Sequence, residues 1–498
     1  MELNNVKGWG GNTGALIAGA GPTGLTLGCD LARRGIRARI VERSAELFPG
    51  SRGTGLQPRT LEVFDDLGII DAVHAAGGPI PRMVTWTDGQ RGDEWNLIPR
   101  SGPTPTTPYA EAWMLPQWRT QEILYTRLRE LGGEVHFSTE LTDFTQDADG
   151  VTATVTGADG TETTVRAACL VAADGGRSTV RKALGIGMTG ETVTPDTMLV
   201  GDVRADGIDR LNWHLWQQAS GGMLALGPLP GTDTFQVFAR FTESDAAPDV
   251  SPEGIRAVVA ERTHLTAENI REVLWVSGFR ARAAMADRFR SGRVFLAGDA
   301  AHIHSPAGGQ GLNTSVQDAY NLGWKLDLVL QGLAGPELLD TYEEERIPIA
   351  AGVLGISSRI HRLELAAKGM KQRPDETGQL KINYRGGSLT AERRSAVPEG
   401  ALRAGDRAPD APLPDGTRLF DLFRGPHFTL LAFGTTEIPP VDSEMIHTHR
   451  IPAGTPIADE AYADQGLFLV RPDGYVALAT HDPSDLAAHP AWLHGRAG

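Results

Sequence analysis

The chain has 498 residues and 60 glycines, yet no three-residue repeat runs through it and 41% of its residues are hydrophobic. This composition excludes a collagen-like or largely disordered protein, and the length allows about three domains. The net charge of −15, without a long basic run, argues against nucleic acid as a partner.

The first predicted element is a βαβ unit over residues 15–42. A short apolar strand (ALIAG) leads through a G-x-G-x-x-G turn into a helical stretch, and a second strand (RARIVE) ends in a glutamate. Bare backbone in such a turn can approach a pyrophosphate at the helix N-terminus, and the glutamate can accept bonds from ribose hydroxyls. The alternative is an ordinary tight turn followed by a surface glutamate. The predicted dinucleotide-binding residues are Gly19, Gly21, Pro22, Thr23, Gly24 and Glu42.

Downstream, helical and strand-rich stretches alternate. Residues 134–176 alternate in strand fashion, and residues 192–279 read mostly as strands, which suggests an inserted sheet domain. The last hundred residues read as a separate small α/β domain. Helices are predicted near 57–67, 119–132, 252–262, 309–329 and 337–357.

Two further glycine turns follow predicted strands. One is ADGG at 173–176, and the other is GDAAH at 298–302, which leads into PAGGQGLN at 306–313. Gly308, Gly309 and Gly311 lie at the start of a predicted helix, so free N–H groups at its positive end suit a negatively charged group of a ligand.

At this point the sequence resembles the class A flavin-dependent monooxygenases, the family of para-hydroxybenzoate hydroxylase. The three glycine turns occur in the family's order, together with SRGTGLQPRTLE at 51–62 and DAYNLGWKL at 318–326. The resemblance extends from about residue 15 to residue 474. It is closest to the branch that hydroxylates phenols and actinomycete aromatic polyketides.

The resemblance implies roles for individual residues. Glu42 would bind the FAD ribose beside Arg43, and Asp299 would bind ribityl or pyrophosphate oxygens. Asp174 would couple the flavin and nicotinamide sites, with a plain Asx-turn as the alternative. The other residues implied to contact the cofactor are Arg52 and Gln121 at the phosphates, Gly298, Pro306, Gly309, Gly311, and Leu312 and Asn313 through main-chain groups at the isoalloxazine.

Several of these assignments have simpler alternatives. The alternative for Asp299 is a turn residue, for Arg52 a solvated surface arginine, and for Gln121 an exposed helix residue. Arg52 is also the one candidate for a catalytic contact in the pocket. The sequence assigns no side-chain base.

The resemblance also implies an activity. NADPH, or NADH, would bind transiently and reduce FAD, O₂ would form a C4a-hydroperoxide, and the terminal oxygen would pass to an aromatic carbon of a phenolic or polycyclic polyketide substrate. Two alternatives within enzymes are Baeyer–Villiger chemistry and modification of an antibiotic. An alternative from another class is a flavin-bound sensor without turnover.

The expected fold is α/β. A Rossmann-type FAD-binding domain is interleaved with an antiparallel-sheet substrate domain, and a thioredoxin-like domain without redox cysteines ends the chain. The predicted boundaries are 14–78, 116–190 and 285–370 for the FAD domain, 79–115 and 191–284 for the substrate domain, 371–398 for a linker, and 399–498 for the thioredoxin-like domain.

Further features of the sequence concern the cellular compartment, metal binding, the oligomeric state and the substrate pocket. Cys29 and Cys169 lie far apart in apolar segments, which fits a reducing cytoplasm, and no apolar run is long enough to span a membrane. His302 and His304 form an H-x-H pattern, but without a third ligand cluster we expect no metal. The protein is expected to be a monomer or homodimer.

Seven aromatic residues line either a wide pocket or the core: Trp95, Trp113, Trp118, Trp213, Trp216, Phe235 and Phe238.

Overall fold

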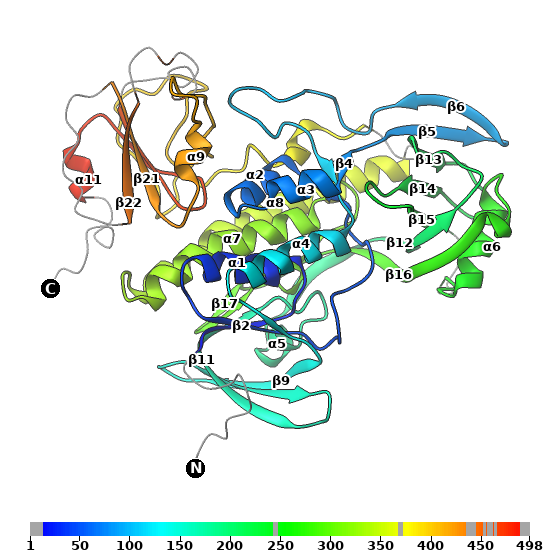
Figure 1. Ribbon diagram of the computed structural model, residues 1–498, viewed down its shortest axis with the longest axis horizontal. Coiled ribbons are helices and arrows are strands. Elements are labelled where there is room, and N and C mark those ends of the chain that lie inside the picture. The colour runs from blue at the N-terminus through cyan, green and yellow to red at the C-terminus, as the bar shows by residue number, and fades with distance from the viewer. Residues whose placement is uncertain are drawn as a thin grey trace.

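The computed structural model describes residues 13–242, 248–366, 372–434, 445–451, 455, 462 and 466–488. Over these residues the chain forms a mainly parallel sheet, a long antiparallel sheet, a C-terminal mixed sheet and a short three-stranded sheet (Figure 1). The short sheet consists of β3 (Gly55–Leu56), β7 (Trp113–Met114) and β4 (Gly78–Pro79).

The mainly parallel sheet carries the βαβ unit. Its strand order is β17-β18-β11-β1-β2-β8, and β9 and β10 extend it from β11. Helix α1 packs between α7 and α4 above this sheet, and its apolar residues belong to the largest hydrophobic core (Figure 1). The bounds are β1 (Thr13–Ala18), α1 (Pro22–Arg33), β2 (Ala38–Val41), α4 (Gln117–Glu130), β8 (Val135–His136), β9 (Thr139–Gln146), β10 (Val151–Gly157), β11 (Glu162–Ala172), β17 (Arg290–Ser291), β18 (Val294–Leu296) and α7 (Gly311–Leu330).

The antiparallel sheet has the order β19-β16-β12-β15-β14-β13-β5-β6, with one parallel pair between β13 and β5. Helix α6 covers one face through a separate hydrophobic core that includes Trp216 and Phe235. The bounds are β5 (Arg82–Thr87), β6 (Gln90–Trp95), β12 (Met188–Ala205), β13 (Asn212–Trp216), β14 (Leu224–Pro228), β15 (Phe235–Phe241), α6 (Pro252–Arg262), β16 (Ile270–Ala286) and β19 (His302–Ile303).

The C-terminal sheet has the order β20-β24-β23-β21-β22 and lies at one end of the molecule (Figure 1). It packs against α7, where the fully buried Trp324 joins the core of this sheet. Behind Trp324, the buried Glu345 carboxylate pairs with Lys325 at 2.7 Å and with Arg471 at 2.5 Å. The bounds are β20 (Ala391–Glu392), α9 (Leu419–Phe423), β21 (Phe428–Phe433), β22 (Ile446–Ile451), β23 (Gly466–Val470), β24 (Val476–Thr480) and α11 (Ser484–Ala488).

The predicted α/β fold, with a Rossmann-type unit interleaved with an antiparallel sheet, is confirmed. The expected helices appear, although the last one is longer than expected: α8 (Asp340–Ala366) extends nine residues beyond Ser357. The other helices are α2 (Pro58–Asp66), α3 (Ile70–Ala76) and α5 (Thr179–Ala183). The domain boundaries remain a prediction. Strands β12 and β16 run past the predicted edges of the sheet domain, and β19 joins the sheet from the range predicted for the FAD domain.

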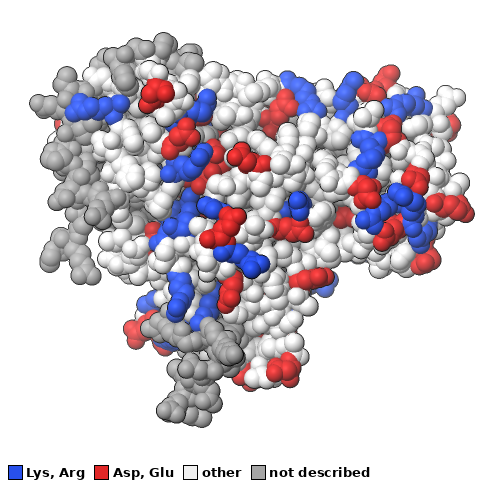
Figure 2. Space-filling view, viewed as in Figure 1, with Lys and Arg blue, Asp and Glu red and all other residues white. Residues whose placement is uncertain are grey.

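The drawn surface carries both signs of charge. On the face in Figure 2, Lys and Arg side chains are interspersed with Asp and Glu. The described residues also include no helix that is long and apolar enough to cross a bilayer.

Candidate active site

The G-x-G-x-x-G turn between β1 and α1 gives its three glycines different surroundings. Gly19 has a φ of +107°, and a Cβ there would lie 2.3 Å from the Ala173 carbonyl oxygen. A Cβ on Gly24 would lie 2.0 Å from the Gly19 carbonyl oxygen, whereas nothing lies within 4 Å of the Cβ position of Gly21. Gly19 and Gly24 therefore permit the tight turn, and Gly21 leaves bare backbone facing open space at the start of α1, as pyrophosphate binding requires.

Pro22 and Thr23 begin α1 directly after this turn. Pro22 occupies the first helical position, where its missing N–H costs no hydrogen bond. The Thr23 hydroxyl oxygen would be 2.4 Å from a Cβ on Gly298, so the first and third glycine turns are in contact.

Glu42 directly follows β2, and its side chain is held toward the first turn. Its Oε2 accepts a hydrogen bond from the Ala20 N–H at 2.9 Å, and its Oε1 accepts one from the Ser44 N–H at 3.0 Å. These bonds fix the carboxylate beside the open backbone at Gly21. Arg43 follows on the exposed surface.

The second glycine turn, after β11, is tied to the third one. Asp174 Oδ2 accepts from the Thr179 N–H at 2.7 Å and so caps α5, while its Oδ1 is buried without a hydrogen-bond partner among the described residues. The Arg181 guanidinium donates to the Gly176 and Ala300 carbonyls. Asp174 thus has a helix-capping role in this structure, and its second oxygen is left for another donor.

The third turn brings Asp299 toward Arg52. The Asp299 side chain is exposed, but the protein surrounds it enough to raise the pKa of its carboxyl, while the charges of His302 and Arg52 oppose that rise. Arg52 is also exposed and lies over the ring of Phe48, 4.7 Å from its centroid. The exposure of Arg52 therefore agrees with the alternative that it is a solvated surface arginine. Its guanidinium nevertheless faces Asp299.

The 306–313 loop leads into α7, and Pro306 at its start is exposed. Gly309 has a φ of +63°, which favours glycine, and Gly311 is the first helical residue. Asn313 Oδ1 accepts from the Gln57 N–H at 2.7 Å, and its Nδ2 donates to the Gly55 carbonyl at 2.8 Å. The same residue thus holds the 53–57 segment against the start of α7.

Leu312 adds an apolar contact to this arrangement. Its Cδ1 lies 3.4 Å from the Cβ position of Gly53. On α4, Gln121 is almost fully buried, and its Nε2 donates to the Phe48 carbonyl at 2.9 Å. The alternative of Gln121 as an exposed helix residue is therefore wrong, because its amide fastens the loop that carries Arg52.

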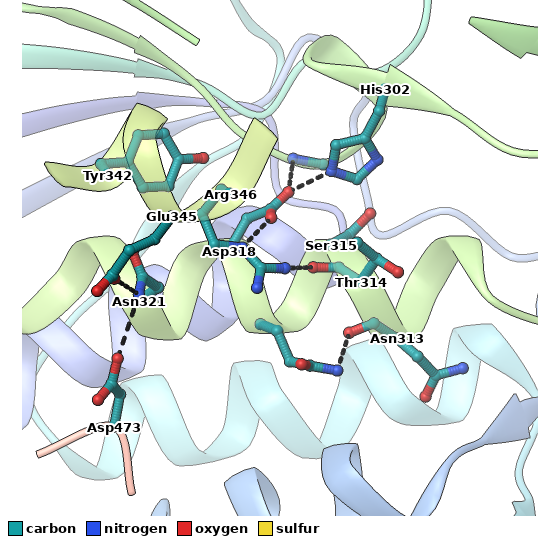
Figure 3. A network of polar contacts seen from close by, with 12 residues as sticks. His302, Asn313, Thr314, Ser315, Asp318, Asn321, Tyr342, Glu345, Arg346 and Asp473 are labelled. Carbon is teal, nitrogen blue, oxygen red and sulfur yellow. Dashed lines mark hydrogen bonds and ion pairs between the residues drawn. The ribbon is translucent and has the colours of Figure 1, made fainter. Parts of the chain in front are cut away.

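A buried polar network behind the site was not predicted (Figure 3). Asp318 on α7 accepts from the Gly298 N–H at 3.0 Å and contacts His302 Nε2 at 2.5 Å. Its other oxygen accepts from Arg346 Nε at 2.8 Å. Burial alone would raise the pKa of the Asp318 carboxyl, but the charges of His302 and Arg346 lower it to about 2. Asp318 therefore fastens the GDAAH turn to α7 and α8. An aspartate within an apolar helical stretch was the available signal for this network.

The H-x-H pattern takes part in the same network. His304 Nε2 lies 2.9 Å from His302 Nδ1, so both ring nitrogens of His302 have protein partners. No group of His, Cys, Asp and Glu in the described part of the chain is arranged to hold a metal ion.

The seven aromatic residues divide between core and sheet face. Trp216 and Phe235 belong to the buried core under α6, and Trp95, Trp213 and Phe238 pack around a smaller core. Trp113 donates its indole N–H to the Val73 carbonyl at 3.2 Å, whereas Trp118 is half-buried. Most of them are structural residues.

The comparisons with known proteins agree with this geometry. Residues 12–357 match the family described as FAD binding domain, and residues 402–497 match the aromatic-ring hydroxylase C-terminal domain. The chain belongs to the first family, and it is an FAD-dependent aromatic monooxygenase.

Individual relatives are similar over nearly their full length. A flavin-dependent monooxygenase of Mycobacteroides abscessus is 48% identical, covering 93% of this chain and 96% of the relative. A 12-dehydrotetracycline 5-monooxygenase/anhydrotetracycline 6-monooxygenase of Streptomyces rimosus is 38% identical, with coverages of 93% and 94%. The solved ternary complex of aklavinone-11 hydroxylase with FAD and aklavinone is 30% identical, with a TM-score of 0.83 and coverages of 98% and 100%. These names support the hydroxylase prediction over the Baeyer–Villiger, antibiotic-modifying and sensor alternatives.

The residues present fit FAD. Gly21 offers uncovered backbone, Glu42 a fixed carboxylate, and Asp174 a buried oxygen without a partner. When bound, FAD supplies the redox chemistry and the activation of oxygen.

A buried carboxyl in the antiparallel sheet gives a first prediction. Asp202 on β12 is 2% exposed, and burial raises its pKa to about 6, with Ser51 opposing the rise. A carboxyl whose pKa is raised on folding costs stability at pH values above its unfolded value of about 3.8, and the cost grows until pH exceeds the folded value. Asp202→Asn is therefore expected to raise the free energy of unfolding by roughly 2–3 kcal/mol at pH 8.

The measurement is the thermal unfolding midpoint of the Asp202→Asn variant and the parent chain from pH 4 to pH 8. The gain in stability should disappear near pH 4, where the buried Asp202 carboxyl is protonated and therefore as neutral as the asparagine. Asp143→Asn, at an exposed position on β9, is the control. An Asp202→Asn gain that stays constant over this pH range would contradict the assignment.

Proposed function

We propose that the chain uses NADPH and O₂ to hydroxylate a phenolic or polycyclic polyketide ring. The observation that carries the proposal is the meeting of three glycine turns and the N-terminus of α7 at one place, with the antiparallel sheet beside it. The names of relatives that act on tetracycline intermediates, aklavinone and pentachlorophenol support this substrate class.

The proposed roles follow from the positions of the residues. The Gly21 backbone and the first turn of α1 would bind the pyrophosphate, and Glu42 would accept bonds from the ribose. Asp299 and Arg52 would face the ribityl and phosphate region. The free N–H groups at the start of α7, next to Gly309 and Gly311, would stabilise negative charge on the reduced ring.

The substrate would lie between the 306–313 loop and the antiparallel sheet. There the protein excludes water and holds the ring, and the nicotinamide cofactor would bind transiently. We also propose a cytoplasmic location. Cys29 and Cys169 are both free, buried thiols, which supports a reducing compartment.

The test is NADPH oxidation by the FAD-loaded enzyme in the presence of anhydrotetracycline, aklavinone, pentachlorophenol and a set of hydroxyanthraquinones. At least one compound should stimulate oxidation and yield a product with an unchanged carbon skeleton that is heavier by one oxygen atom or, for pentachlorophenol, has oxygen in place of one chlorine. Ring expansion would indicate Baeyer–Villiger chemistry instead, and a lack of stimulation by every compound would favour a flavin-bound sensor.

A further inference from the structure

Four polar side chains beside the 306–313 loop each have a buried atom without a hydrogen-bond partner in the described part of the chain. The atoms are Arg240 Nε on β15, His361 Nε2 and Glu364 Oε1 on α8, and Arg373 Nε in the segment after α8. An unpaired buried donor or acceptor costs folding free energy, so several in one place call for a common explanation.

The four groups form one cluster. Arg240 Nε lies 3.7 Å from Asp196 Oδ2, too far for a hydrogen bond. Burial lowers the pKa of His361, and the charge of Arg240 lowers it further, while the Asp196 carboxylate opposes both. Burial raises the pKa of Glu364, and the charges of Arg373 and Arg240 oppose that rise. Groups from the sheet, from α8 and from the following segment therefore act on one another.

The cluster adjoins the flavin end of the site. Ser305 Oγ lies 2.8 Å from His361 Nδ1. Arg373 Nη1 lies 3.5 Å from the Cβ position of Gly309, and Ile360 Cδ1 lies 3.2 Å from that of Gly308. Since Arg240 belongs to the antiparallel sheet, the cluster bridges this sheet and the 306–313 loop.

The hydrogen-bonding capacities of the unpaired atoms define a ligand. Ser305 Oγ accepts from the Ala307 N–H at 3.4 Å and can donate its own hydroxyl hydrogen to His361 Nδ1; in that tautomer the ring proton is on Nε2. The cluster then offers three N–H donors and one carboxylate acceptor. The charges of the two arginines are balanced by Asp196 and Glu364, so the complementary ligand is an uncharged edge with several acceptor oxygens and a hydroxyl.

We propose that Arg240, His361, Glu364 and Arg373 form a subsite that binds the keto and hydroxyl oxygens along one edge of a polycyclic aromatic substrate. This inference rests on the proposed function. It names side chains that select the substrate and orient the ring that reacts.

The test compares two probes, 1,8-dihydroxyanthraquinone and unsubstituted 9,10-anthraquinone, by calorimetric titration of the FAD-loaded enzyme. The parent enzyme should bind the dihydroxy probe more tightly. Arg373→Met and Glu364→Gln should each weaken binding of the dihydroxy probe by about 10- to 100-fold and change binding of the unsubstituted quinone much less. Arg362→Met, at an exposed residue of α8 paired with Glu191, should change neither affinity.

Two results would overturn the inference. One is equal binding of both probes by the parent enzyme, and the other is a preference that persists unchanged in the Arg373→Met and Glu364→Gln variants. If Arg373→Met does not fold, Arg373→Lys, which keeps the charge but loses the Nε donor, replaces it and should also reduce the preference. Turnover of the panel described above is measured separately, so NADPH oxidation without the binding preference would refute the subsite and leave the proposed function standing.

Discussion

Replacing Gly21 by valine is expected to remove FAD binding while leaving the fold intact. Gly21 has a φ of −72°, which any residue can adopt, and its Cβ position has no atom within 4 Å. A Cβ there meets no protein atom, and a valine side chain would occupy the space that the pyrophosphate needs. The loss of two charge-assisted hydrogen bonds corresponds to an FAD affinity about 100-fold lower, or weaker still.

The measurement pairs an FAD titration, followed by flavin absorbance, with the thermal unfolding midpoint of the FAD-free protein. Gly352→Val, on the exposed side of α8 with nothing near its Cβ position, is the matched control and should retain FAD binding. Gly24→Ala should behave in the opposite way, because its Cβ would lie 2.0 Å from the Gly19 carbonyl oxygen and destabilise the turn itself. If the Gly21→Val variant bound FAD normally, the assignment of the pyrophosphate to the first turn would be wrong.

Replacing Asp318 by asparagine is expected to cost about 3–5 kcal/mol of stability, because it leaves the buried Arg346 guanidinium without its carboxylate. It should also weaken FAD binding, since Asp318 holds the Gly298 N–H and His302 in place. The folded pKa of about 2 lies below the unfolded value, so this stability is present above about pH 4 and is lost as the pH falls toward 2.

The unfolding free energies of the parent and the Asp318→Asn variant should therefore converge at low pH. Asp327→Asn, on the same helix, is the control. Burial raises the pKa of the Asp327 carboxyl, so neutralising it should cost far less at pH 7. An Asp318→Asn variant with unchanged stability and FAD affinity would show that the network has no part in holding the GDAAH turn.

The local parts of the site could be predicted from the sequence. The roles of Gly19, Gly21 and Gly24 depend on neighbours within a few residues and on the strand and helix that flank them. Glu42 could also be predicted, because the length of the βαβ unit determines where its second strand ends.

Contacts between distant segments could not be predicted in this way. The network of Asp318, His302 and Arg346 forms only because α7 and α8 pack against the third glycine turn. No local sequence pattern indicates that these segments lie close together. The burial of Gln121 has the same origin, since its partner Phe48 lies on another segment. The lack of a hydrogen-bond partner for Arg240 Nε and Arg373 Nε can be recognised only from the three-dimensional positions of the surrounding residues.

The most direct test of the central claim is turnover under ¹⁸O₂ with NADPH and the panel compound that best stimulates NADPH oxidation. The expected product carries one ¹⁸O atom on an aromatic carbon. A product whose new oxygen comes from water, or NADPH oxidation without any oxygenated product from every compound of the panel, would contradict it.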